Sequence, residues 1–233
     1  MDFFGAAVNA PQADQMVWPD ELKLAASVEN SHIALGEPLA LSWTLVNNGT
    51  APVLVPTKLD IESLVVRVSA TDGHGNTLFL RPAEQKACSH NPLRDLRPGE
   101  SATGSTNVFW GRDGFTFERP GHYVVDVITM WQITETWVGA DSEVHVWVSF
   151  PVSDADNRVA ALMLHPEVGL AVAAPSAPPT ENALSRIAEA NKIHAEHPAM
   201  ARLKTLSHAS RLKLSSRSAA PAAKAPAPKK RRK

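Results

Sequence analysis

Cysteine is almost absent from this chain of 233 residues. Cys88 is the only one, so no disulfide can form within the chain, and nothing in the composition requires an oxidising compartment. No apolar run approaches the roughly 18–20 residues that a membrane-spanning helix needs. The N-terminal stretch MDFFGAAVNAPQADQ contains neither a basic segment nor an apolar core of signal-peptide length. We therefore expect a soluble, cytoplasmic protein, with leaderless export as the open alternative.

Motifs for catalysis and for cofactor binding are also lacking. The sequence contains no G-x-S-x-G nucleophile elbow, no Walker motif and no dinucleotide-binding glycine pattern. Cys88 and His90 are close in sequence, but residues two apart on a loop need not face each other. The segment HAEH at 194–197 has its histidines three apart, not four as in helical zinc peptidases, and Pro198 follows it. The sequence therefore predicts a non-enzymatic protein with no catalytic residue, metal site or cofactor.

Charge is distributed unevenly along the chain. Residues 1–180 carry ten Lys and Arg against 21 Asp and Glu, whereas residues 181–233 carry 13 against three. No acidic residue follows Pro198. An acidic body with a basic end indicates that the basic end has a role of its own, such as binding an anionic partner.

Strand patterns occupy the chain from about residue 20 to residue 151. Between residues 39 and 45 apolar side chains alternate strictly with small or polar ones, which is typical of a half-buried strand. Turn sequences such as NNGT at 47–50 and DGHGN at 72–76 separate the strands. The other predicted strands are residues 22–28, 51–55, 62–71, 77–81, 101–109, 121–133 and 143–150, with a turn at 135–140 and an irregular loop at 82–98.

Tyr123 is the only tyrosine, and it directly follows a Pro-Gly turn. This placement is typical of a tyrosine corner, in which the phenol hydrogen-bonds to the turn before it. Together with seven or eight short strands, it predicts a mainly β protein, an immunoglobulin-like antiparallel β-sandwich over residues 20–151. Residues 1–19 are predicted to be a flexible N-terminal arm.

The pattern changes after Pro151. Apolar residues recur at helical spacing over residues 158–164, 180–196 and 199–214, and the stretch AAPSAPPT at 173–180 has the composition of a linker. Residues 152–214 are therefore predicted to form a small helical appendage. The remaining residues, 215–233, consist mainly of Ala, Pro, Ser, Lys and Arg and cannot bury a core, so we expect a disordered basic tail.

Four short motifs carry a family resemblance. They are GEP at 36–38, NNGTAPV at 47–53, LRPGE at 96–100 and PGHY at 120–123. Through them residues 22–150 resemble bacterial immunoglobulin-like accessory domains, and the layout is similar to that of small intracellular proteinase inhibitors of immunoglobulin-like fold. The loop GRDGFTF at 111–117 is similar to one found in uncharacterised bacterial proteins with a sandwich and trailing helices. The resemblance implies a fold and no particular activity.

The loop after residue 109 is the first candidate interaction site. Aromatic and arginine side chains are preferred anchors of protein interfaces. The candidate residues are Trp110, Arg112, Asp113, Phe115, Phe117 and Arg119. The alternative interpretation is that Phe115 and Phe117 close one end of the sandwich.

The basic tail is the second candidate. It ends in Lys229, Lys230, Arg231, Arg232 and Lys233, which can bind the phosphates of a nucleic acid or an anionic membrane surface. A merely solubilising end is the alternative, and the lack of aromatic residues in the tail argues against base stacking.

These features together predict a non-enzymatic protein-binding or structural accessory module whose partner is another protein. The basic tail would act as an electrostatic tether. Two alternatives remain from the sequence: a nucleic-acid-associated protein led by the tail, and a protease inhibitor of immunoglobulin-like fold.

Overall fold

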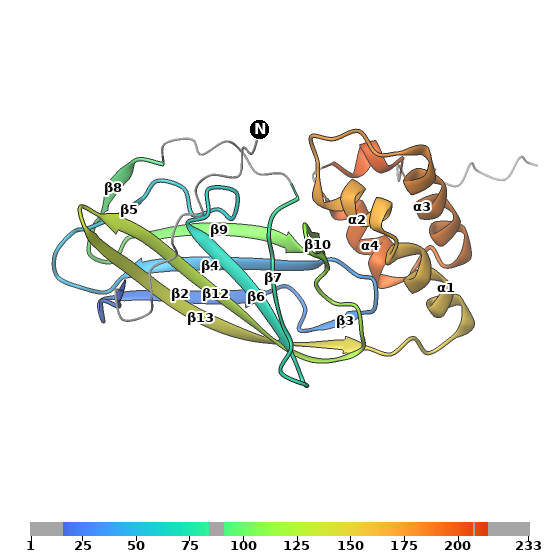
Figure 1. Cartoon of the computed structure of the whole chain (residues 1–233), viewed down its shortest axis with the longest axis horizontal. Coiled ribbons are helices and arrows are strands. Elements are labelled where there is room, and N and C mark those ends of the chain that lie inside the picture. The colour runs from blue at the N-terminus through green and yellow to red at the C-terminus, as the bar shows by residue number, and fades with distance from the viewer. Residues whose placement is uncertain (1–15, 84–90, 207, 214–233) are drawn as a thin grey trace, which may run out of the picture.

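The structure, a computed structural model, describes residues 16–83, 91–206 and 208–213. Over these residues the chain is mainly β, with four α-helices gathered at one end of the strands (Figure 1). None of the described helices is long and apolar enough to cross a membrane. The basic tail, Cys88 and His90 lie outside the described residues, as does most of the predicted N-terminal arm.

The larger sheet contains six strands. Its order is β1-β13-β12-β6-β7, with β3 also paired to β13. The bounds are β1 Met16–Val17, β3 His32–Ala34, β6 Val66–Asp72, β7 Thr77–Phe79, β12 Gly121–Ile133 and β13 Thr136–Ser149. A long antiparallel hairpin of β12 and β13 forms its centre. The predicted turn at 135–140 is wrong in its extent, because β13 already begins at Thr136.

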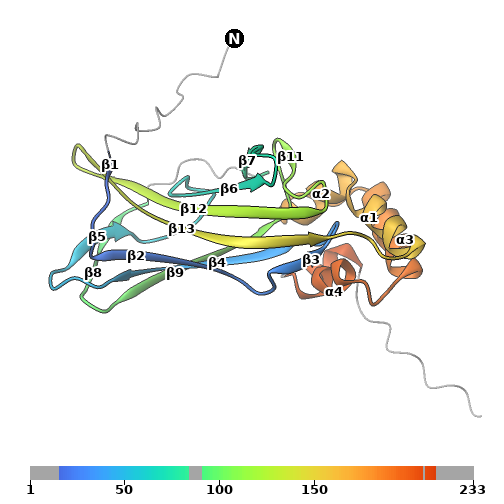
Figure 2. The ribbon, with the colours of Figure 1, turned by 90° about the horizontal axis from the view of Figure 1, so that it is seen from below.

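The smaller sheet has the order β2-β4-β9 and lies under the larger one (Figure 2). Its strands are β2 Leu22–Val28, β4 Leu39–Asn47 and β9 Ser101–Val108. Two further antiparallel pairs complete the strands: β5 Val53–Pro56 with β8 Leu93–Leu96, and β10 Trp110–Gly111 with β11 Gly114–Phe115.

The main core lies between the two sheets. Inward-facing residues of β4 alternate as the sequence predicts, and Trp43 and Leu45 are completely buried. Val125 and Val127 of β12 are equally buried and belong to the same cluster. This burial confirms the period-two pattern, and removal of these apolar side chains from water is the main stabilising contribution in this part of the fold.

The predicted tyrosine hydrogen bond is present. The Tyr123 hydroxyl donates to the carbonyl oxygen of Arg119 at 2.9 Å. The ring of Tyr123 also packs edge to face against Phe117, with ring centroids 5.1 Å apart. The bond ties the start of β12 to the turn that precedes it.

The predicted immunoglobulin-like antiparallel sandwich is wrong in its finer detail, although the mainly β class is confirmed. The sheets form a curled half-barrel and not a clear immunoglobulin sandwich. Both β1 and β3 pair with β13 in parallel. At the same edge the Ala26 amide of β2 donates to Ser142 Oγ of β13 at 3.0 Å, which links the two sheets. The sequence motifs led to the wrong sheet arrangement because they specify turns. Gly36, Gly99 and Gly121 in these motifs all have positive φ, and a turn conformation does not determine which strands pair.

Four helices follow the strands. They are α1 Asp154–Met163, α2 Pro166–Ala173, α3 Glu181–Ile193 and α4 Pro198–Thr205, followed by the short 3-10 helix η2 Ala209–Leu212. Helix α2 was not among the predicted helices; Pro166 occupies its first turn, where its missing amide hydrogen costs nothing. The helices share a second buried cluster that includes Phe109 and Phe115 from the strands.

The second cluster joins the helices to the sheets. Phe109 and Phe115 pack edge to face with ring centroids 5.2 Å apart. Trp110 lies directly against Gly169 of α2, where a Cβ atom would come within 2.4 Å of Trp110 Cδ1. The glycine therefore lets the helix backbone approach the indole ring closely.

We predict that Gly169→Ala destabilises the protein even though alanine is normally preferred over glycine within a helix by about 1 kcal/mol. Overpacking against Trp110 should lower the free energy of unfolding by about 1–3 kcal/mol. Denaturant unfolding measures it. A double-mutant cycle with Trp110→Ala provides the control: the cost should shrink in that background, and an equal cost in both backgrounds would contradict the proposed contact.

Candidate functional site

The aromatic side chains of the predicted interaction loop are largely buried. Phe115 and Phe117 are buried in the protein, and Trp110 is half-buried against α2. Arg112, Asp113 and Arg119 are exposed. The alternative interpretation, in which the phenylalanines close the end of the sheets, describes their positions better than a free aromatic surface does.

The exposed charges of this loop are also engaged locally. Asp113 Oδ2 forms an ion pair with Arg81 Nε at 2.9 Å, and the Arg112 amide donates to the Arg81 carbonyl oxygen at 3.0 Å. The loop is thus fastened to the chain after β7. Of its six residues, Arg112, Asp113 and Arg119 remain exposed, and their role in binding a partner stays a prediction.

A groove that the sequence did not indicate lies where β3 meets the helices. Figure 2 shows β3 beside α4 at the helical end of the sheets. The groove has a volume of about 360 Å³. Its apolar lining comes from three separate parts of the chain: Ile33, Leu35, Phe150, Pro151, Val152 and Pro198. A second hollow of about 350 Å³ continues from it along α4 and shares Ile33, Glu37 and Pro198.

Two of the apolar lining residues are unusually exposed. Phe150 keeps 73% of its surface accessible and Val152 keeps 92%. Both lie in the connection between β13 and α1, at the mouth of the groove. Isolated exposed apolar residues are common, but these two lie together beside a concave apolar site.

Glu37 supplies the partly buried charge in the groove. Its Oε2 accepts a hydrogen bond from the Ala34 amide at 2.9 Å. Burial raises the pKa of this carboxyl above its usual value, while the Ala34 hydrogen bond and Arg202 act in the opposite direction. A cation placed beside Glu37 would stabilise the ionised form of its carboxyl group by electrostatic attraction.

Asp156, His194 and His197 form the polar end of the groove. Asp156 Oδ1 lies 2.9 Å from His194 Nδ1, and hydrogen bonds from Ser153 and His194 hold the pKa of Asp156 below its usual value. His197 is buried and caps α4, since its Nδ1 accepts from the Ala199 amide at 3.2 Å. Burial lowers the pKa of His197, which keeps the ring neutral.

Arg202 forms the opposite wall. Its Nη1 donates to Glu29 Oε2 at 2.8 Å and its Nη2 donates to Asn107 Oδ1 at 2.9 Å. These bonds connect α4 to the smaller sheet. The groove itself is lined by two carboxylates, those of Glu37 and Asp156, whereas Glu29 and its partner Arg202 line the adjoining hollow.

Both histidines of the groove make local hydrogen bonds. Among the described residues, the hydrogen bonds of His194 and His197 go to Asp156 and the Ala199 amide, and neither imidazole is bonded to a hydroxyl that it could activate. Within the same part of the chain no group of three or more His, Cys, Asp or Glu side chains could hold a metal ion. The HAEH segment therefore ends α3 and caps α4.

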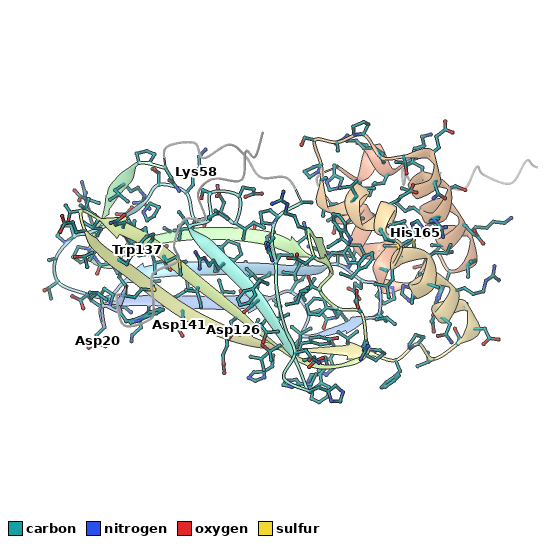
Figure 3. All side chains as sticks on the ribbon, viewed as in Figure 1. Asp20, Lys58, Asp126, Trp137, Asp141 and His165 are labelled. Carbon is teal, nitrogen blue, oxygen red and sulfur yellow. The ribbon has the colours of Figure 1, made fainter. Side chains whose placement is uncertain are left out.

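A second acidic surface lies on the outer side of the larger sheet. Asp126 of β12 and Asp141 of β13 project from it in Figure 3, and Glu143 lies opposite Asp126 in the register. Burial, followed by repulsion from Glu143 and Asp141, raises the pKa of Asp126. A basic ligand could therefore bind either to this acidic surface or to the groove, so the two sites have to be distinguished by experiment.

Comparison with known proteins yields partial structural similarities. No protein-family model matches the chain, and no curated protein matches its sequence. A β-glucosidase from Listeria innocua is 20% identical with a TM-score of 0.32, over 55% of this chain and 16% of the glucosidase. A DUF4785 family protein from Legionella pneumophila is 11% identical with a TM-score of 0.33, over 56% of this chain and 29% of that one. The alkylpurine DNA glycosylase AlkC from Pseudomonas fluorescens is 20% identical with a TM-score of 0.30, over 55% and 31%.

The chain therefore spans less than a third of each of these proteins, and the similarities assign it no activity. The sheet geometry, in turn, corrects the family resemblance drawn from the sequence. The larger sheet is a curled half-barrel and not plainly one half of an immunoglobulin sandwich. The assignment to bacterial immunoglobulin-like accessory domains, or to proteinase inhibitors of that fold, is wrong.

We predict that His197 makes stability depend on pH. Because its pKa is lowered in the folded state, the unfolded chain binds more protons than the folded one below the ordinary histidine pKa of 6.5. The free energy of unfolding should be unaffected by His197 at higher pH and should fall as the pH drops through this range. Denaturant unfolding between pH 8 and pH 5.5 measures the slope.

The matched variant for this prediction is His197→Asn, because asparagine can still cap α4. Its pH slope should be shallower than that of the parent protein. Glu37, whose raised pKa acts in the opposite sense, is present in both proteins and cancels in the difference. Identical slopes would contradict the assigned role of His197.

Proposed function

We propose that the protein is a non-enzymatic module that recognises an extended segment of another protein in the groove between β3, the β13–α1 connection and α4. The observation that carries this proposal is the pair of exposed apolar side chains, Phe150 and Val152, at the mouth of a concave apolar site. The tether role of the basic tail remains a prediction from the sequence.

Apolar contact supplies most of the affinity in this proposal. Phe150 and Val152 are exposed in the free protein, so a partner that covers them removes apolar surface from water. Complete burial of one such side chain contributes about 1.5–3 kcal/mol. The buried Ile33 and the exposed Pro198 also line the site.

The charges of the groove define the chemistry of the partner. Glu37 and Asp156 lie on the same side as the apolar lining, and Glu29 lies near the single guanidinium of Arg202. An acidic partner would be repelled by these carboxylates, whereas a lysine or arginine would pair with Glu37 or Asp156. The preferred segment therefore has an apolar residue next to a basic one.

The test is selection from a random displayed peptide library against the full chain. The enriched peptides are expected to combine an aliphatic or aromatic residue with an adjacent Lys or Arg. The double variant Phe150→Ser, Val152→Ser should weaken their binding by more than about tenfold, because two apolar contacts are lost. Titration calorimetry with a selected peptide measures the change.

The control is Phe79→Ser. Phe79 is also exposed, at 60%, but it lies on β7 at the far edge of the larger sheet and does not line the groove. This variant should bind the selected peptides as the parent protein does. Enrichment of acidic peptides, or binding unchanged by the double variant, would refute the proposal.

A further inference from the structure

The C-terminal segment of the chain is positively charged, whereas the groove is lined by carboxylates. Residues 214–233 contain seven Lys and Arg and no Asp or Glu. The described residues 16–83, 91–206 and 208–213 carry 15 Lys and Arg against 21 Asp and Glu, so the body to which this segment is attached is acidic. Opposite charges of this size on one chain attract each other.

The composition of residues 214–233 also suits the groove. The sequence APAPKKRRK at its end joins alternating Ala and Pro to a basic run. Proline-containing extended segments bind apolar grooves at a low cost in conformational entropy. In the groove, Phe150, Pro151 and Pro198 provide apolar contacts, and Glu37 and Asp156 provide the opposite charge.

The segment is attached close to the groove. Thr205, the last residue of α4, lines the hollow that continues from it, and Lys213 is the last described residue, eight positions later. A chain of 20 residues extends over at most roughly 65–70 Å. Residues 214–233 can therefore reach the groove of the same molecule.

We propose that residues 214–233 of this chain occupy the groove in the free protein, with lysines of the segment paired to Glu37 and Asp156 and its proline stretch over Phe150 and Val152. The inference rests on the proposed function, because it makes the segment a competitor for the site at which a partner segment binds. A partner must displace it before it can bind.

Covalent attachment makes weak contacts sufficient. A short connection holds a segment at an effective concentration on the order of millimolar near its site. Few ion pairs and a small apolar contact are then enough to fill the groove most of the time. A separate partner with the same chemistry gains access by making better apolar contacts with Phe150 and Val152.

The acidic outer face of the larger sheet is the competing location. Asp126, Asp141 and Glu143 lie there, on the side of β12 and β13 that faces away from the smaller sheet. The groove is favoured because α4, which leads into the segment, forms its wall, and because apolar side chains adjoin its carboxylates.

The experiment is zero-length carbodiimide cross-linking of the full chain, followed by mass spectrometry of the cross-linked peptides. Lys224, Lys229, Lys230 and Lys233 are the reactive amines of the segment. Cross-links are expected to concentrate on Glu29, Glu37 and Asp156. Their yield should fall by roughly fivefold in Phe150→Ser, Val152→Ser, since the apolar contact that holds the segment is lost. Cross-links that concentrate on Asp126, Asp141 and Glu143, or none from these lysines, would overturn the inference.

The matched substitutions are Glu37→Gln and Asp141→Asn. Glutamine keeps an oxygen that can accept from the Ala34 amide, so Glu37→Gln removes charge without removing that bond. It should lower the yield at the remaining groove carboxylates, whereas Asp141→Asn should not. Mixed light and heavy protein identifies the donor: cross-links within one copy support the inference, and cross-links only between copies overturn it.

Failure of this inference can be told from failure of the proposed function. If the segment does not cross-link to the groove but selected peptides still bind there, only the inference fails. If the double variant Phe150→Ser, Val152→Ser changes neither the cross-link yield of the segment nor the affinity of any selected peptide, the groove is not a binding site and both proposals fail.

Discussion

The close packing of Trp110 on Gly169 is the contact on which the position of the helices against the sheets depends. It fixes α2 against the β10–β11 hairpin, and the edge-to-face pair of Phe109 and Phe115 extends the contact into the helical core. The helices are short, and helices of this length are held by tertiary packing and not by intrinsic propensity. Together with the Arg202 bonds to Glu29 and Asn107, this packing keeps α4 beside β3, where the groove lies.

The groove combines exposed apolar surface with a partly buried carboxyl group. Phe150 and Val152 expose apolar surface at its mouth, and Glu37 holds a partly buried carboxylate inside it. Exposed apolar surface favours association in general, whereas a carboxylate with little solvent selects for a cation. A site with both properties discriminates between segments of similar hydrophobicity by their charge.

The sequence predicted those features that depend on neighbouring residues. The alternation around Trp43 and the turn before Tyr123 are local, so the core strand and the hydrogen bond to Arg119 follow from them. Strand pairing is not local, and for that reason the turn motifs suggested the wrong sheet arrangement. The groove could not be predicted, because its lining joins Ile33, Phe150 and Pro198, which no sequence pattern connects. The loop aromatics pointed to an interface, but the sequence left open whether they faced a partner or closed one end of the sandwich; their packing against the helices was not predicted.

Hydrogen exchange of the full chain carrying Trp110→Ala tests the central claim most directly. If this packing positions the helices, amides of α2 and α4 should lose protection while those of β4 and β12 keep it, because the core between the sheets is separate from the helical cluster. The His197-capped start of α4 should then exchange faster together with Ile33 of β3. Unchanged protection of α2 and α4 in this variant would contradict the account.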